Sequence, residues 1–357
     1  SVTSIGTYAF KGSTGITSLT FTPTSTLTTI SQEAFDGCTG LTGTQAIPDS
    51  VTSIGQSGFQ STNITSFTFG AGSQLTTIDN FAFQLNSSLT SFTMPNTVTT
   101  IGTQLFYQCT SLASVSISTH NSVTTLGSNM FADTALTSIT IPSNITTISA
   151  NAFSGITTLL TVVMNTGSVV FSTIFSGINT ITSATFDYAG AIPANSCLSI
   201  TSLTSVTIGN TITSIGTNAF KLCTNAAFTS IIIPSSVTTI GTDAFTGVPL
   251  TTVVMNSGSV LFSTGFTGVN TITTVTFDYT GTIETSACNG RTAITSVTIG
   301  NTITSIGISA FQNCSGLTTI AIPDAVTSIG NNAFQSCNLM TSITFGANST
   351  LTTIGGS

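Results

Sequence analysis

The chain has 357 residues, of which 40% are hydrophobic and only 4% are charged, and its formal net charge is −7. Its three cations are too few for the phosphate contacts of nucleic-acid binding or for adhesion to anionic membranes. The single histidine, His120, leaves little room for catalytic triads, imidazole metal sites or acid–base relays, so the composition argues against an enzyme.

Hydroxyl side chains fill the polar half of the chain, with 78 Thr and 50 Ser. Thr or Ser interrupts every apolar stretch, so no membrane-spanning run of about 18 apolar residues is predicted. The N-terminal residues include no basic region and no apolar signal segment. We therefore expect either that a signal was removed or that the chain belongs to something longer.

A four-residue unit, apolar-Thr-Ser/Thr-apolar and commonly followed by Gly, recurs along the whole chain. Fifteen steps separate Ile5 from Ile354, a mean of about 23 residues per repeat, and such a period is typical of a solenoid. Each repeat is called a rung below. The clear copies begin at Val2, Leu27, Val51, Leu75, Val98, Val123, Ile145, Ile212, Val237, Ile303, Val326 and Leu351, and degenerate copies begin at Val169, Ile192, Val260 and Ile283.

Two further blocks complete each rung. A small residue and Phe follow the first block, and stacked copies are predicted to form an internal ladder of rings. An alternating apolar–hydroxyl block comes next and ends in Pro or Gly; it predicts half-buried strands at residues 64–69, 136–141, 203–208 and 294–299. The ladder is predicted from Phe10, Phe35, Phe153, Phe220, Phe245, Phe311 and Phe334.

These blocks predict a mainly β repeat solenoid of about sixteen rungs that forms one continuous domain over residues 1–357. At a strand spacing of about 4.8 Å, such a stack would make a rod roughly 75 Å long. Residues 145–236 and 237–327 match segment by segment and indicate a duplicated block of four rungs. Neither end carries an evident capping rung.

Residues 317–323 and 326–337 carry a recognisable pattern, LTTIAIP followed by VTSIGNNAFQSC. Together they resemble the BspA-like, or Treponema-type, leucine-rich repeats of 23 residues, and the resemblance covers essentially the whole chain. It implies a curved or rod-like β-solenoid rather than a reaction. Members of this family are typically surface-exposed or secreted proteins of bacteria and protists and are often described as adhesins. The chain departs from the family in its near absence of charge.

The seven cysteines follow the repeat. Five of them lie three residues after the repeat Phe, in a column that elsewhere holds Ile or Val, so a buried apolar role is predicted for them. Cys197 and Cys288 take the place of Phe in the ladder. Cys314 and Cys337 lie on adjacent rungs at a separation that suits a disulfide in an oxidising environment. No zinc motif is present, and no metal site is predicted. The column of five is Cys38, Cys109, Cys223, Cys314 and Cys337.

No catalytic or cofactor-binding residue is predicted, and no cofactor. Among ten carboxylates, only Glu33 and Asp36 are near neighbours in sequence, and Asp187 and Asp278 stand four rungs apart, too far for a glycosidase pair. We interpret these two as strand-end turn residues and His120 as an exposed turn residue. Sequons that could accept N-glycans occur at Asn63, Asn86, Asn144, Asn313 and Asn348.

Because neither end is capped, the two ends are predicted to be complementary, and such a head-to-tail contact generates an open filament. The leading hypothesis is a non-enzymatic extracellular or cell-surface structural protein that stacks with itself into a fibre. The chief alternative is a ligand-binding segment of a longer surface adhesin or receptor, with a host or cell-surface protein or glycan as partner. The expected assembly ends are Ile5 and Phe10 at one end and Met340, Phe345 and Ile354 at the other.

Two other classes are less favoured. Stacked Thr rows could bind ice, but rungs of uneven length break a planar lattice match. A sugar-active enzyme on a β-solenoid would need clustered carboxylates, which the sequence does not place together. Neither binding to nucleic acid nor insertion into a membrane is expected.

Overall fold

The computed structural model describes residues 2–119 and 122–356. They fold into a mainly β, parallel solenoid of about sixteen rungs, which confirms the predicted fold class. The chain divides into two compact units, Ser1–Ile181 and Thr182–Ser357. The boundary falls inside the first duplicated block.

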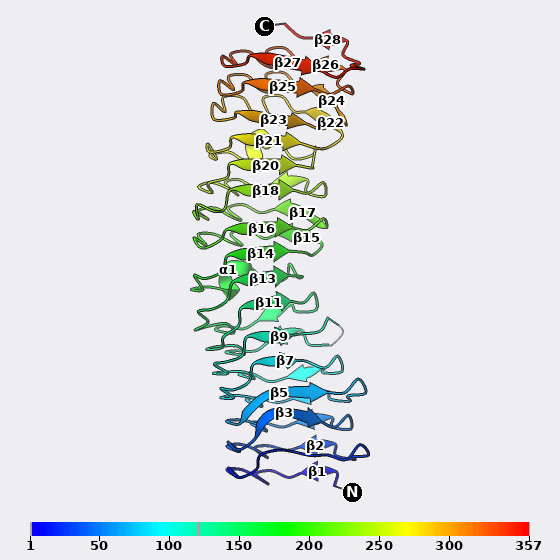
Figure 1. Ribbon diagram of the computed structural model, residues 1–357, viewed down its shortest axis with the longest axis vertical. Helices are drawn as coiled ribbons and strands as arrows, with labels where there is room; N and C mark the ends of the chain where they lie inside the picture. Colours follow the sequence, from blue (N-terminus) through cyan, green and yellow to red (C-terminus); the bar gives the residue numbers. More distant parts are fainter. Residues whose placement is uncertain (1, 120–121, 357) are drawn as a thin grey trace. The chain divides into compact units, whose positions relative to one another are not determined.

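Unit 1 contains two kinds of strand and one helical turn, α1 (Phe171–Ile174). The first block of each rung forms a strand of only two residues, and the second block forms a longer one. Figure 1 shows the longer strands β3, β5, β7 and β9 following one another in chain order. The short strands are β1 (Ser4–Ile5), β2 (Thr29–Ile30), β4 (Ser53–Ile54), β6 (Thr77–Ile78), β8 (Thr100–Ile101), β10 (Thr125–Leu126) and β12 (Thr147–Ile148); the longer ones are β3 (Thr42–Ile47), β5 (Asn63–Phe69), β7 (Ser91–Thr93), β9 (Ser114–Ser116), β11 (Ser138–Ile141) and β13 (Thr161–Met164).

Unit 2 repeats this arrangement around a second helical turn, α2 (Phe262–Gly265). Its second-block strands are all four residues long, and all of them except β27, whose four residues are exposed, alternate between more exposed and more buried side chains. These strands are β14 (Ser183–Phe186), β16 (Ser205–Ile208), β18 (Ser230–Ile233), β20 (Thr252–Met255), β21 (Thr274–Phe277), β23 (Ser296–Ile299), β25 (Thr319–Ile322) and β27 (Ser342–Phe345). The first-block strands are β15 (Gly190–Ile192), β17 (Ile212–Ile215), β19 (Thr239–Ile240), β22 (Gly281–Ile283), β24 (Ile303–Ile306), β26 (Ser328–Ile329) and β28 (Thr353–Ile354).

Neighbouring rungs pair in parallel, with equivalent residues in register. In unit 1, Ile5 pairs with Ile30, and the same column continues through Ile54, Ile78 and Ile101. Because each rung repeats the pattern of the one before it, every apolar position forms a buried column along the stack. Three of the four predicted second strands begin two residues before β11, β16 and β23, whereas the strand predicted over residues 64–69 lies within β5.

Threonine hydroxyls extend the pairing beyond these short strands. The hydroxyl of Thr52 donates to the backbone carbonyl of Thr28 at 3.1 Å, and Thr76 donates to Thr52 in the same way. In unit 2, Thr327 donates to Thr304 at 3.1 Å and Thr352 to Thr327 at 3.0 Å. Backbone carbonyls therefore receive a side-chain partner on the next rung, which accounts for much of the Thr content.

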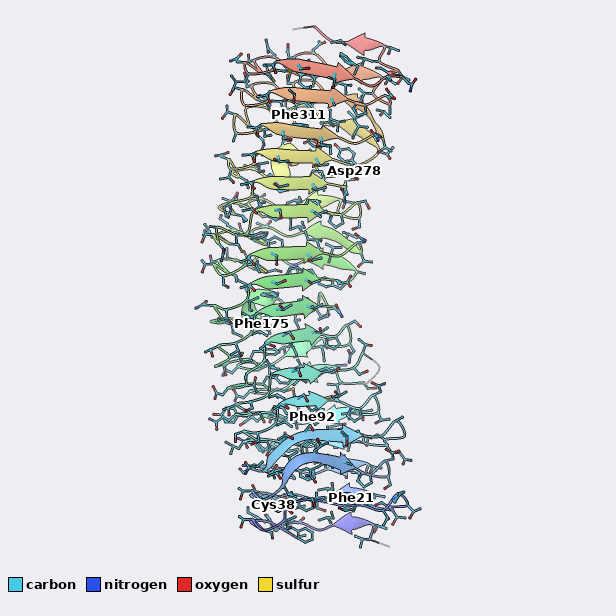
Figure 2. The ribbon with its side chains drawn as sticks, in the orientation of Figure 1. Phe21, Cys38, Phe92, Phe175, Asp278 and Phe311 are labelled. Carbon is cyan, nitrogen blue, oxygen red and sulfur yellow. The ribbon has the colours of Figure 1, made fainter. Side chains whose placement is uncertain are left out.

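Stacked phenylalanine rings form the interior of unit 1. Ring centroids lie 5.4 Å apart for Phe10 and Phe35 and 5.2 Å apart for Phe35 and Phe59, with nearly parallel planes. The ladder then continues through Phe83, Phe106, Phe131, Phe153 and Phe175. Figure 2 labels Phe175, the last of these ladder residues, and also Phe92, which lies in β7.

In unit 2 the ladder is interrupted where cysteine replaces a ring. Phe220 stacks on Phe245 at 5.3 Å, and Phe311 stacks on Phe334 at 5.4 Å. Cys288 occupies the column between these two segments and is fully buried. The ring of Phe277, in β21, packs edge-on against the ring of Phe311, with the ring centroids 6.1 Å apart. It thus helps to fill the space that the Cys288 side chain, which is smaller than Phe, leaves in the core.

In most rungs two backbone positions, one on either side of the ladder residue, adopt left-handed conformations; the rungs that contain α1 and α2 have one, at Gly177 and Gly268. Asn218 (φ 55°) and Leu222 (φ 60°) flank Phe220 in this way. Asn, Asp, Ser and Gly recur at these positions because they tolerate positive φ better than β-branched residues do.

Candidate functional site

The described residues bring no catalytic group of side chains together. In the part of the chain that the structure describes, no three His, Cys, Asp or Glu residues are placed so as to hold a metal ion. No helix in those residues is long and apolar enough to cross a membrane. His120 lies outside the described residues.

Three half-buried carboxylates near cations form ion pairs. Lys11 contacts both Glu33 and Asp36, the latter at 3.0 Å, and the hydrogen bond from Lys11 lowers the pKa of Glu33 below its usual value. Lys221 lies 2.8 Å from Asp243 and lowers the pKa of that carboxyl group. These pairs link neighbouring rungs.

Asp187 and Asp278 occupy the turns that follow β14 and β21, where strand-end residues were expected (Figure 2 labels Asp278). Each carboxylate lies against a glycine of the next rung. A Cβ atom added at Gly209 would come within 2.7 Å of Asp187 Oδ1, and one at Gly300 within 2.9 Å of Asp278 Oδ1. Glycine at these positions therefore leaves room for the aspartate.

Glu284 and Arg291 were not singled out from the sequence, yet both contact α2. The carboxylate of Glu284 accepts the backbone N–H of Ser263 at 3.0 Å. The guanidinium of Arg291 donates to the carbonyls of Phe266 and Val269, at 3.0 and 2.8 Å, beyond the other end of the helical turn. The two charges thus complement the partial charges of the helix ends.

A comparison of the two duplicated blocks could have identified Glu284 and Arg291 from the sequence. At the equivalent positions of the first block stand Pro193 and Ile200, which have no charge. Arg291 also lies over the ring of Phe262, with its guanidinium carbon 4.8 Å from the ring centroid. Because both side chains contact backbone or ring atoms of their own unit, their observed contacts are structural.

All seven cysteines are free thiols in the described structure. Each thiol of the five-residue column donates to a backbone carbonyl of an earlier rung, as Cys314 does to Cys288 at 3.1 Å and Cys337 to Phe311 at 3.2 Å. Burial raises the pKa of Cys109, Cys223 and Cys314 to about 12, which disfavours the thiolate. Pairing of Cys314 with Cys337 stays a prediction.

The five sequons differ in exposure. Asn86 is fully buried, and its carbonyl oxygen accepts the backbone N–H and the hydroxyl of Thr62 at 2.7 and 2.8 Å. Asn63 and Asn144 are half-buried and donate to backbone carbonyls, both at 2.7 Å. Asn313 and Asn348 are exposed, so the structure leaves these two open to modification.

The residues predicted at the assembly ends differ in exposure from equivalent residues inside the stack. Ile322 of β25 is 1% exposed, whereas Phe345, its partner in β27, is 46% exposed. Ile354 is 63% exposed and Phe10 is 42% exposed, while Ile5 and Met340 are half-buried.

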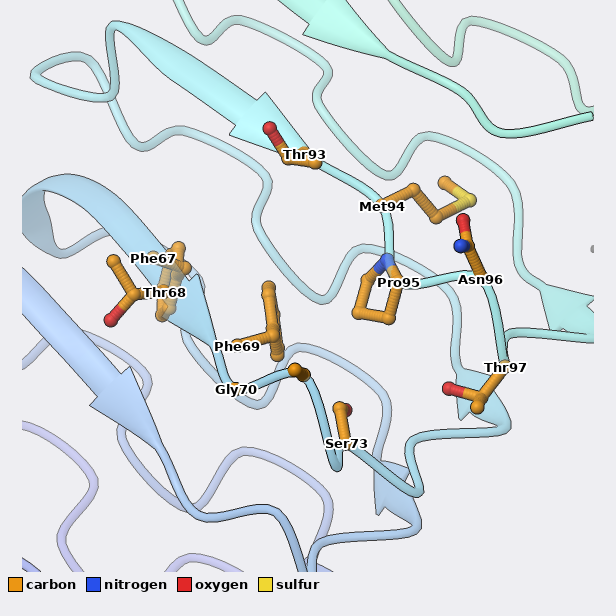
Figure 3. Close-up of a pocket in the computed structure, with 11 residues that line it drawn as sticks. Phe67, Thr68, Phe69, Gly70, Ser73, Thr93, Met94, Pro95, Asn96 and Thr97 are labelled. Carbon is orange, nitrogen blue, oxygen red and sulfur yellow. The ribbon is translucent and has the colours of Figure 1, made fainter.

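A hollow recurs where the second strand of a rung ends in its Pro or Gly turn. In unit 1, two adjoining hollows of about 740 and 400 Å³ share Phe69 and Gly70. In unit 2, hollows at the equivalent place are lined by Gly209 and Pro234 and by Pro323 and Gly346. Figure 3 shows the smaller hollow of unit 1, with Phe69 and Pro95 facing the same space.

The described fold can be compared with known proteins. The family described as "BspA type Leucine rich repeat region (6 copies)" matches residues 3–123, 76–189, 190–290 and 281–357. A search of curated proteins finds no match.

Several solved structures are similar to the chain. A leucine-rich repeat protein from Bacteroides ovatus is 22% identical, with 99% of this chain and 78% of that one covered and a TM-score of 0.35. A leucine rich cell surface protein from Faecalibacterium prausnitzii is 24% identical (91% and 86% covered, TM-score 0.34), and the pneumococcal vaccine antigen PcpA is 18% identical (92% and 79% covered, TM-score 0.38). The match to the family model spans nearly the whole chain, and the chain therefore belongs to the BspA-type leucine-rich repeat family.

Proposed function

We propose that this chain is a non-enzymatic, extracellular structural protein whose end rungs stack head to tail on those of a second copy. The observation that carries the proposal is the exposure of the same repeat columns in both end rungs. Phe10 belongs to the ring column that holds Phe334, and Ile5 to the column that ends in Ile354. Stacking would bury these side chains and continue the parallel ladder.

The charge distribution supports this contact. After Asp324 the sequence contains no charged residue, and none precedes Lys11. Lys11 itself is paired with Glu33 and Asp36 on the next rung. No like charges would therefore face each other across the junction, and assembly should depend little on salt.

The test is sedimentation velocity and negative-stain electron microscopy of the full chain and of Ile354→Lys. The unmodified chain is expected to elongate with concentration, and Ile354→Lys to stay monomeric because the junction would bury an unpaired charge. Thr298→Lys, which adds the same charge at an exposed position in β23, is the matched control and should assemble normally. A chain that stays monomeric at high concentration would contradict stacking.

A second candidate is a ligand-binding segment of a longer surface adhesin, whose further rungs would cover the same end columns. The observation that favours it is the pair of adjoining hollows in unit 1, which do not involve the end residues Ile5 and Phe10. In that case the chain would be monomeric, and ligand binding would depend on residues that line those hollows.

A further inference from the structure

We propose that the adjoining hollows of unit 1 form a binding site for a neutral oligosaccharide. The residues that would carry binding are Phe21, Asp49, Phe69, Gln74 and Asn96, and this set is called the unit 1 groove below. The inference does not require head-to-tail stacking. It names the ligand class for the second candidate function, and its test uses residues that are not assembly-end residues.

The two phenylalanines of the unit 1 groove are more exposed than the buried members of their column. They occupy the last apolar position of the second block, where Ile47 and Met94 are 4% and 2% exposed. In unit 2 the same column holds Phe186, which is 1% exposed. Phe21 and Phe69 are instead half-buried and line the hollows. Their partly exposed rings can pack against the apolar C–H face of a sugar, as aromatic side chains do in ligand pockets.

A carboxylate and two amides accompany the rings. Asp49 is exposed, and its carboxylate lies over the turn at Gly70 and Gly72, where an added Cβ would come within 2.2 and 2.7 Å of its oxygens. Glycine at both positions therefore keeps space for this carboxylate beside the Phe69 ring. The exposed side chains of Gln74 and Asn96 supply both donors and acceptors. An apolar platform with a few convergent polar groups suits a polyhydroxyl ligand.

The charge of the unit 1 groove disfavours anionic ligands. Asp49 is its charged group, and none of the residues that line the two hollows is a cation. The cation of this unit, Lys11, is engaged by Glu33 and Asp36. A sulfated or uronic-acid glycan would therefore meet a carboxylate without a compensating cation.

The strand pairing disfavours an extended peptide. Peptides commonly bind by adding a strand to a free sheet edge, but β5 is already paired with β3 on one side and β7 on the other. Proline-rich peptides use aromatic-lined grooves with indole or phenol donors, and the lining residues here include neither Trp nor Tyr. A neutral glycan uses the rings, the carboxylate and the amides without requiring a free edge.

The experiment measures binding of the full chain to soluble dextran, laminarin, mannan and xylan, with heparin as an anionic comparison, by affinity electrophoresis and calorimetry. Binding to at least one neutral polymer is expected, with little dependence on salt. Phe69→Leu, which keeps apolar packing but removes the ring, should weaken binding by about tenfold. Asp49→Asn should weaken it as well. Asp187→Asn is the matched control, because Asp187 lies beside Gly209 in unit 2 but follows the buried Phe186.

Three outcomes would overturn the proposal: failure of all four neutral polymers to bind, tighter binding of heparin than of any neutral polymer, or equal weakening by Asp187→Asn and Asp49→Asn. Circular dichroism of each variant verifies the fold before binding is compared. Ile354→Lys serves as a further control and should bind as the unmodified chain does, so that failure of stacking and failure of glycan binding are distinguished.

Discussion

The carboxylate of Glu284 accepts a hydrogen bond from the backbone N–H of Ser263 at 3.0 Å. Glu284 is the residue directly after β22, and Ser263 lies in α2 on the preceding rung, so the contact joins the two rungs. Burial raises the pKa of Glu284 above its usual value of 4.5, against the opposing effect of backbone N–H donors. Tyr279, Cys288 and Arg291 are the neighbouring ionisable side chains whose pKa values Glu284 affects.

The first prediction concerns pH. A carboxyl group with a raised pKa in the folded state favours the protonated form, so its contribution to stability is complete below the unfolded pKa and is lost as pH rises through the folded pKa. Glu284→Gln keeps an oxygen acceptor for Ser263 but cannot ionise. The unmodified chain should therefore lose stability relative to Glu284→Gln as pH rises from about 4.5 to 7, and the difference in their unfolding free energies should change in favour of Glu284→Gln. A difference that is constant with pH in denaturant titrations would contradict this.

The second prediction concerns Arg291. Arg291→Ala removes two charged hydrogen bonds to carbonyls and the contact with the Phe262 ring. It should lower the unfolding free energy by about 1.5–3 kcal/mol, the range for hydrogen bonds to charged groups. Arg291→Lys should recover only part of this loss, because an ammonium group cannot reproduce the planar fork. Full recovery by Lys would show that charge alone matters.

The third prediction concerns the ring ladder. Phe220 is fully buried and stacks on Phe245, and Phe186 meets it edge-on at 5.9 Å. Phe220→Ala should cost about 3–5 kcal/mol. Coupling in a solenoid runs between nearest neighbours, so hydrogen exchange should rise around residues 190–250 and stay slow on distant rungs. Phe345→Ala, at an exposed ring, is the comparison and should change exchange little. Uniform loss of protection would exclude one-dimensional coupling.

The fourth prediction concerns thiol reactivity. Iodoacetamide at pH 8 should modify Cys337 before the other cysteines in the native chain, because Cys337 is half-buried whereas the other six are buried. Burial raises the pKa of Cys314 to about 12, so its thiol should react only after unfolding. Mass spectrometry of chymotryptic peptides identifies the labelled site, because Leu317 and Phe334 separate Cys314 from Cys337 whereas no Lys or Arg does. If oxidation joins Cys314 to Cys337, labelling of both should fall together in oxidised but not in reduced samples.

Several features of the fold could be predicted from the sequence because they recur in every rung. The ring of Phe35 and the thiol of Cys38 lie in buried columns because equivalent residues of neighbouring rungs stack upon them. The lengths of the strands were less well predicted. Thr204 precedes β16, and its backbone N–H and its hydroxyl both donate to the Thr182 carbonyl, at 2.8 and 2.9 Å, so the side chain adds to the backbone pairing just before the strand begins.

The candidate sites were less accessible to sequence reasoning, because they depend on departures from the repeat. Phe69 and Phe186 occupy the same column, yet one is half-buried and lines a hollow while the other is 1% exposed. Likewise, Asn86 and Asn348 both belong to sequons, but Asn86 is buried and accepts a hydrogen bond from Thr62, whereas Asn348 is exposed. Exposure at a given position is set by side chains on adjacent rungs about 23 residues away.

The sequence by itself determined the period, the parallel stacking, the apolar columns and the near absence of charge, because periodic placement of apolar and β-branched residues constrains every rung in the same way. Only the tertiary structure decided which members of a column are open to solvent. It also decided that Glu284 and Arg291 meet opposite ends of α2, and that Asp49 lies over glycine beside the half-buried ring of Phe69. These relationships arise from the packing of particular side chains between rungs, which a repeat pattern leaves unspecified.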